Sequence, residues 1–125
     1  VQEVAEIERA WQTMRDAEGD VARFTEADVA FHAALLRASH NRVFMQLAGI
    51  IQAALQFSLH ASNAAVDAHG EAVAVHRELI EALRLRDGAT ARACSRRMLD
   101  LAARDLAVAE RKRPLTTTAL PSNEC

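Results

Sequence analysis

Aromatic residues, glycine and proline are all scarce in this chain of 125 residues. Aromatic residues make up 4% of the sequence, tyrosine is absent, and there are only four glycines and two prolines. A β-sheet protein favours aromatic and β-branched residues in its strands and needs glycine and proline in its turns, so this composition argues against one. Alanine and leucine, both good helix formers, are abundant instead. We therefore expect an all-α protein.

Disulfide bonds, long apolar runs and an excess of positive charge are missing as well. Cys94 and Cys125 are the only cysteines, which is too few for a disulfide framework and typical of a reducing compartment. No apolar run approaches the length of about 18 residues that a membrane span needs, and no segment resembles a signal peptide. The net charge of −2 excludes a strongly basic nucleic-acid-binding domain. We expect a cytoplasmic protein without membrane contact.

Apolar residues recur every three or four positions in five segments that are separated by short polar breaks, which is the period of a helix packed on one face. We expect an antiparallel helical bundle whose five main helices cover about residues 1–18, 25–41, 42–60, 65–84 and 89–111. Residues 1–111 then form one domain. From residue 112 the chain is polar, contains proline and has no period, so residues 112–125 are expected to be a flexible tail.

Local signals predict where these helices begin, end and face the core. Thr25 is the expected N-cap of the second helix and Asn41 its left-handed C-cap, and Ser62 with Asn63 is a turn or cap signal after the third helix. The third helix is expected to turn an apolar stripe inward, formed by Phe44, Leu47, Ile51, Leu55 and Leu59.

Asp28 and His32 are the most informative pair in the sequence. Residues four apart lie above one another on a helix, so both side chains can point at one spot. Their face adjoins Phe31 and Leu35, which predicts that it is turned inward. A buried carboxylate needs a partner, and a carboxylate with an imidazole is half of a divalent metal site.

His76 and Met98 are expected to reach the same spot from two other helices. They lie equally far in sequence from the break at Asp87, so an antiparallel hairpin brings them to the same level. Further candidates for the lining of this pocket are His69, Gln52, Gln56 and Asp105. The alternative for each of these residues is a purely structural position, in the core or on a solvated face.

Taken together, Asp28-xxx-His32, the following LLRASHN and His76 within HRELIEALRLRDG resemble the ligand-binding C-terminal domain (FCD domain) of FadR-type GntR transcription regulators, over about residues 1–110. The resemblance implies a truncated form of a six- to seven-helix bundle, a homodimer, and a small carboxylate effector bound in an internal pocket. It also implies operator DNA bound through an N-terminal winged-helix domain that this chain lacks. Because the chain opens without Met and already in a helical pattern, we expect it to be part of a longer protein.

The resemblance also implies a metal site. Many members of the family hold a divalent metal, often zinc or nickel, with one Asp and three His, and the metal anchors the effector. Asp28, His32 and His76 match the first three ligands, but Met98 stands where the fourth is expected. The three matching residues can hold zinc with an open position for water or a carboxylate. A metal-free pocket, in which Met98 only fills space, remains the alternative.

Two other classes of function stay open from the residues alone. One is a metal-dependent enzyme that uses Asp28, His32 and His76, and the other is a structural helical dimerisation module. The enzyme reading lacks a nucleophile motif and has only Asp105 as a loose candidate for a general base. We therefore expect a sensor domain without catalytic residues.

Overall fold

The computed structural model describes residues 2–17, 19–64 and 69–112, and five helices make up nearly all of this part of the chain. They are α1 (Gln2–Asp16), α2 (Val21–Ala38), α3 (Arg42–Ala64), α4 (Gly70–Arg84) and α5 (Gly88–Lys112). Within these ranges there is no strand, which confirms the all-α prediction. Of the predicted tail over residues 112–125, Lys112 belongs to α5, and residues 113–125 lie outside the described residues.

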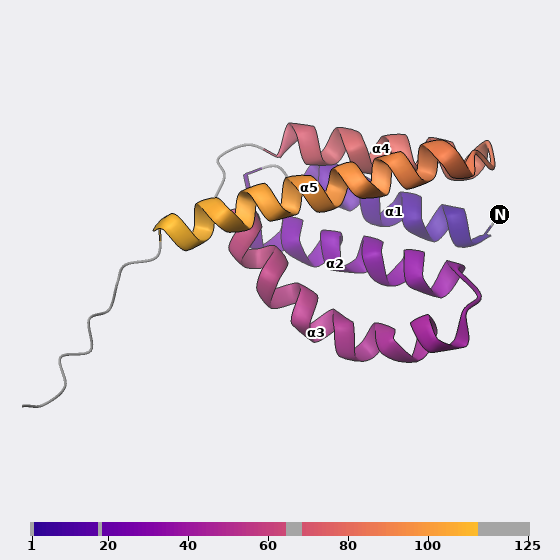
Figure 1. The fold of residues 1–125 in the computed structure, drawn as a ribbon, viewed down its shortest axis with the longest axis horizontal. Helices are drawn as coiled ribbons and strands as arrows, with labels where there is room; N and C mark the ends of the chain where they lie inside the picture. Colours follow the sequence, from indigo (N-terminus) through magenta and orange to yellow (C-terminus); the bar gives the residue numbers. More distant parts are fainter. Residues whose placement is uncertain (1, 18, 65–68, 113–125) are drawn as a thin grey trace, which may run out of the picture.

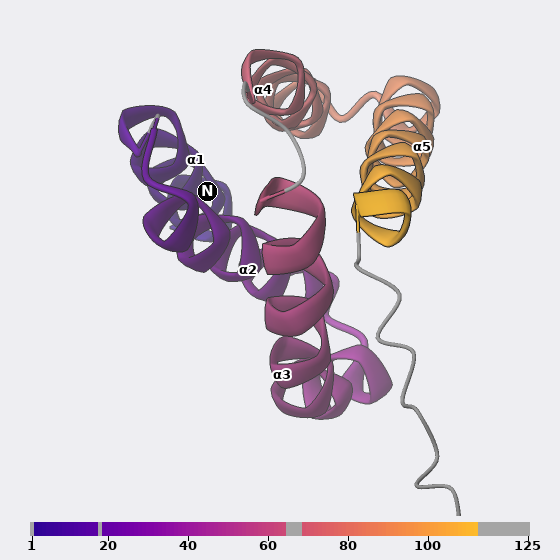
Figure 2. The same cartoon turned by 90° about the vertical axis from the view of Figure 1, so that its left-hand side faces the viewer.

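The helices form a closed ring in which each helix packs against two others. α1 packs on α2 and α4, α5 packs on α4 and α3, and α2 packs on α3. Figure 1 shows α4 and α5 as an antiparallel hairpin, and Figure 2 shows all five helices arranged around a common centre. As a consequence, α2 and α4 face each other across the middle of the ring.

The core fills the seam between α1, α2 and the α4–α5 hairpin. Ile7 and Met14 of α1, which lie two helical turns apart on one face, are buried. Burial of one such side chain stabilises the fold by about 1.5–3 kcal/mol. At the edge of the seam, the Trp11 indole donates a hydrogen bond of 2.9 Å to the carbonyl of Val73, which ties α1 to α4. The main core residues are Ile7, Met14, Phe24, Phe31, Val75, Leu79, Ile80, Cys94 and Met98.

The predicted start of the second helix is wrong by one turn. Asp20 is the N-cap of α2, and its carboxylate accepts the N–H of Arg23 at 3.1 Å. Gly19 precedes it with φ of 88°, a conformation that glycine adopts without strain. Thr25 lies inside the helix and is buried, because the cap at Asp20 allows the helix to begin earlier.

The ends of the next helices also differ from the prediction. His40, with φ of 55°, takes the left-handed position that was assigned to Asn41. The Asn41 side chain instead accepts the N–H groups of Val43 and Phe44 and so caps the start of α3. Asn63 belongs to the last turn of α3 rather than to a turn between helices, since α3 continues to Ala64.

The prediction that Phe44 and Leu47 of the third helix face the core is wrong. Phe44 is 46% exposed and Leu47 is 37% exposed. Since α3 is covered only by α2 and α5, its first turns have an apolar face without a covering helix. No single described helix is long and apolar enough to cross a membrane; only the bent pair 42–50 and 52–61 within α3 would qualify jointly, by length and composition.

We expect Asp20→Ala to lower the free energy of unfolding by about 1 kcal/mol, because the variant loses the side chain that satisfies a free N–H at the start of α2. Asp100→Ala, at an exposed position inside α5, is the matched control and should change stability by less than about 0.5 kcal/mol. Chemical denaturation followed by circular dichroism measures both. Equal losses in the two variants would show that the Asp20 cap contributes nothing.

Candidate functional site

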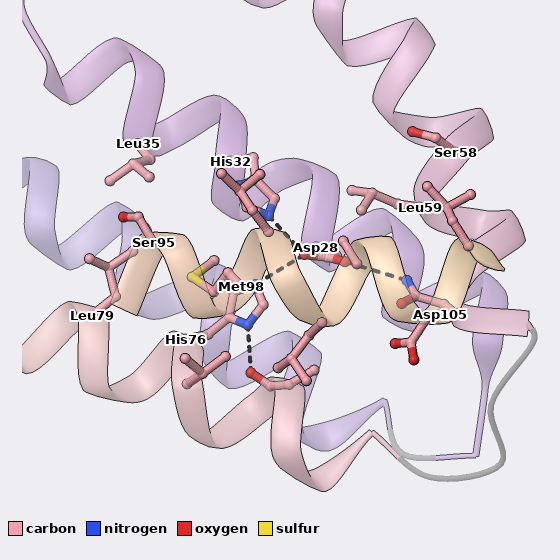
Figure 3. Close-up of a pocket in the computed structure, with 17 residues that line it drawn as sticks. Asp28, His32, Leu35, Ser58, Leu59, His76, Leu79, Ser95, Met98 and Asp105 are labelled. Atoms are coloured by element: carbon pink, nitrogen blue, oxygen red, sulfur yellow. Dashed lines mark hydrogen bonds and ion pairs between the residues drawn. The ribbon is translucent and has the colours of Figure 1, made fainter. Parts of the chain in front are cut away.

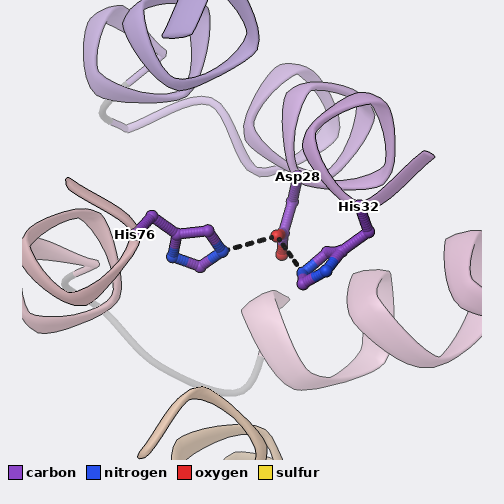
Figure 4. Close-up of side chains that lie close together, drawn as sticks. All are labelled: Asp28, His32 and His76. Carbon is purple, nitrogen blue, oxygen red and sulfur yellow. Dashed lines mark hydrogen bonds and ion pairs between the residues drawn. The ribbon is translucent and has the colours of Figure 1, made fainter. Parts of the chain in front are cut away.

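Asp28, His32 and His76 meet at the centre of the ring (Figure 4). Oδ1 of Asp28 lies 3.2 Å from Nε2 of His32 and 3.2 Å from Nε2 of His76. The i, i+4 spacing on α2 supplies the first pair, and α4 supplies His76 from the opposite side. Asp28 and His76 are buried, while His32 is half-buried. One ligand atom from each residue can be chosen so that all three lie within 4.8 Å of one another, as ligands of one metal ion would.

The ring of His76 is oriented by a backbone carbonyl. Its Nδ1 lies 2.6 Å from the carbonyl oxygen of Ala72, and a carbonyl can only accept, so the hydrogen is on Nδ1. In the neutral ring, Nε2 then presents a lone pair to the Asp28 carboxylate. Two acceptors facing each other at 3.2 Å require a cation between them, either a proton or a metal ion. The same carbonyl contact fixes the tautomer of many metal-binding histidines.

The second carboxylate oxygen of Asp28 is held by Asn63. The Asn63 amide donates to Oδ2 of Asp28 at 3.4 Å and to Oγ1 of Thr25 at 3.2 Å. This leaves Oδ1 directed at the two imidazoles. Asn63 was not predicted as a site residue. Thr25 could have been placed at the site, because it precedes Asp28 by one helical turn.

Burial alone would raise the pKa of Asp28. When His32 and His76 carry a proton on Nε2, the hydrogen bonds from the two rings, together with their charges, outweigh this effect and hold the pKa of Asp28 well below its usual range. The Asp28 carboxylate therefore stays ionised beside the protonated rings, and a metal ion could take the place of their protons.

These three residues line a cavity of about 320 Å³ between α2, α4, α5 and the end of α3 (Figure 3). Met98 and Asp105, both predicted for the pocket, line it from α5. Among the described residues that line it, none is lysine or arginine. The remaining lining residues are Leu35, Ser58, Leu59, Asn63, Ala72, Val75, Leu79, Ser95, Leu99, Leu101, Ala102 and Leu106.

Three of the residues predicted for the pocket lie outside this cavity. Gln52 and Gln56 are exposed, and the described residues through which α3 lines the cavity are Ser58, Leu59 and Asn63. His69 is buried, but its Nε2 bonds to the carbonyl of Asn63 at 2.8 Å and its ring stacks on Phe24. It therefore supports the start of α4 rather than the cavity.

The donor set fits a divalent metal of borderline softness. Two imidazole nitrogens and one carboxylate oxygen are the usual ligands of zinc and nickel. Met98 lies at the cavity wall with a thioether, which is a weak ligand for these ions, so three strong ligands leave a position open. When bound, such a metal would supply positive charge that attracts an anionic ligand.

We expect His76→Leu to lower the free energy of unfolding by about 3 kcal/mol, because the Asp28 carboxylate stays buried after losing a buried partner. Adding Asp28→Leu in the same chain should recover most of this loss, because two apolar side chains of similar size replace the charged pair. Urea denaturation of the two variants in metal-free buffer measures the coupling. A double variant that is less stable than His76→Leu would contradict the expectation.

The comparisons with known proteins agree with this architecture. A family model described as the FCD domain matches residues 1–101. No curated protein and no solved structure matches the chain. Since the matched region covers four of the five helices and most of the fifth, the chain belongs to the FCD domain family, the effector-binding domains of GntR-type transcription regulators.

Proposed function

We propose that this domain senses a small carboxylate through a divalent metal ion held by Asp28, His32 and His76. The observation that carries the proposal is the position of His76: its Nδ1 is bonded to the Ala72 carbonyl, and its Nε2 faces an ionised carboxylate. A zinc or nickel ion would satisfy both acceptors. The family supports the regulatory role, because FCD domains bind small-molecule effectors and dimerise.

Each residue of the site would have a separate role in holding the ion and the effector. Asp28 and His32 hold the ion from α2, and His76 holds it from α4. Asn63 keeps Oδ2 of Asp28 turned away, so that Oδ1 remains free for the ion. The open position takes water or one oxygen of the effector carboxylate, and the surrounding leucines exclude bulk water.

A ligand at this position would act on several helices at once. The Asp28–His76 contact joins α2 to α4 across the ring, and Asn63 joins the same carboxylate to the end of α3. A carboxylate bound at the ion therefore favours the ring geometry in which these contacts are complete. In a GntR-type regulator, this preference would reach operator DNA through a winged-helix domain.

The metal proposal is tested by titrating zinc and nickel into chelator-treated protein in a calorimeter. We expect one ion per chain, and His76→Gln should weaken binding by about a hundredfold or more. Met98→His should tighten binding by about tenfold, or about 1.4 kcal/mol, because it restores a fourth strong ligand. His60→Gln, at an exposed position of α3, is the matched control.

Thermal-shift measurements with small carboxylates complete this test. A carboxylate should raise the melting temperature of the zinc-loaded domain but not of the chelator-treated one. Turnover of the acid would favour the enzyme reading instead. Zinc affinity that is unchanged by Met98→His in a folded protein would show that Met98 does not face the ion.

We also expect the domain to form a homodimer in solution. Members of the family dimerise, and α3 alone exposes five large apolar side chains in its first turns. Sedimentation equilibrium at high micromolar concentration should report twice the chain mass of 13.7 kDa. A single species at the mass of one chain would contradict self-association of this domain. The five side chains are those of Val43, Phe44, Met45, Leu47 and Ile50.

A further inference from the structure

The walls of the cavity contain little positive charge. Its charged or ionisable lining residues are Asp28, Asp105 and the two histidines of the site. The guanidinium of Arg104, which follows the wall residues Leu101 and Ala102 and precedes Asp105, is exposed and shared between Asp105 and Glu71. Apart from a metal ion and the imidazoles, the described part of the wall therefore contains no group whose positive charge could compensate the negative charge of a ligand.

The cavity has two different ends. Figure 3 shows Leu35, Leu79 and Ser95 towards one end and Asp105 towards the other, with Asp28 between them. Along α5, Ser95 and Asp105 are separated by about 15 Å, at the rise of 1.5 Å per residue of a helix. A ligand held at Asp28 can extend its body along apolar walls in one direction, whereas the other direction leads to a second carboxylate.

Charge balance at the ion limits the ligand further. A divalent ion with the Asp28 carboxylate and two neutral imidazoles carries a net charge of about +1, which one carboxylate neutralises. A second carboxylate on the ligand that lies against the wall would lose part of its hydration, and no cation in the described part of the wall would compensate this loss. Towards Asp105 it would also meet a like charge, since the side chain of Asp105 is 14% exposed and faces this cavity.

We propose that the cavity selects monocarboxylates with an apolar body and rejects dicarboxylates, and that Asp105 is the residue that excludes the second carboxylate. This inference rests on the proposed function, because it takes the metal at Asp28, His32 and His76 as the anchor. It goes beyond it by naming the ligand class and a specificity-determining residue. A cavity of about 320 Å³ is at the small end of ligand sites and suits a short acid.

The test compares hexanoate with adipate, which has the same number of carbons and a second carboxylate. Calorimetry on the zinc-loaded domain should show hexanoate binding about tenfold tighter than adipate or better. From acetate to hexanoate, affinity should rise about threefold per methylene, as burial of apolar surface predicts. Equal affinity for hexanoate and adipate, or no rise with chain length, would overturn the inference.

Asp105→Asn tests the role of this residue, with Asp100→Asn as the control on the exposed side of the same helix. Asp105→Asn should tighten adipate binding by about fivefold while changing hexanoate affinity by less than about twofold, because only adipate meets the like charge. Asp100→Asn should change neither. An adipate affinity that is unchanged in folded Asp105→Asn would overturn the assignment of Asp105.

Zinc affinity in the absence of any acid separates this inference from the proposed function. If zinc binds through His76 but the acids do not discriminate as described, the ligand class is wrong and the metal site stands. If zinc fails to bind, or if hexanoate binds equally well after chelation, the anchor itself is wrong, and both proposals fall.

Discussion

The placement of one ionised carboxylate between two imidazoles is the constraint on which this fold depends. Asp28 is 5% exposed, and a charge so far from water is tolerated only when its partners are held in place. His32 is held by the same helix, but His76 must be brought from the opposite side of the ring. Phe31 helps to place it, because its ring meets that of His76 edge to face at a centroid distance of 4.7 Å.

The other contacts of the bundle serve this meeting of α2 and α4. α1 lies beside both helices and buries Ile7 and Met14 against them. α5 is placed by the tight turn after α4, where Asp87 caps its first turn. The Asp87 carboxylate accepts hydrogen bonds from the hydroxyl and from the N–H of Thr90, and both lower the pKa of Asp87. This hairpin brings Met98 to the level of His76. In our proposal, Met98 stands where a fourth strong ligand could be, so the ion keeps an open coordination position.

Features set by local geometry were predictable from the sequence. The pairing of Asp28 with His32 follows from the helical period, and the common level of His76 and Met98 follows from a short hairpin. In each case the distance along the chain determines the distance in space, because the helices are regular.

Features set by packing between distant segments were not predictable. Asn63 reaches Asp28 across 35 positions of sequence, and nothing near Asn63 distinguishes it from a turn residue. Gln52 and Gln56 share the helical period of the lining residues, yet both are exposed and lie outside the cavity. The cap of α2 was misplaced because Asp20 and Thr25 both suit that role, and only the extent of packing along α2 decides between them.

The bond between Trp11 and the Val73 carbonyl has a spectroscopic consequence. Trp11 is the only tryptophan, and the chain has no tyrosine, so its near-ultraviolet fluorescence comes almost entirely from one indole. Guanidinium groups of Arg15 and Arg77 lie 5.1 and 5.9 Å from its ring centre, and charges at such distances shift the emission wavelength. Val73 precedes His76 by one helical turn. The emission of this single fluorophore therefore records the seam between α1 and α4 without any added label.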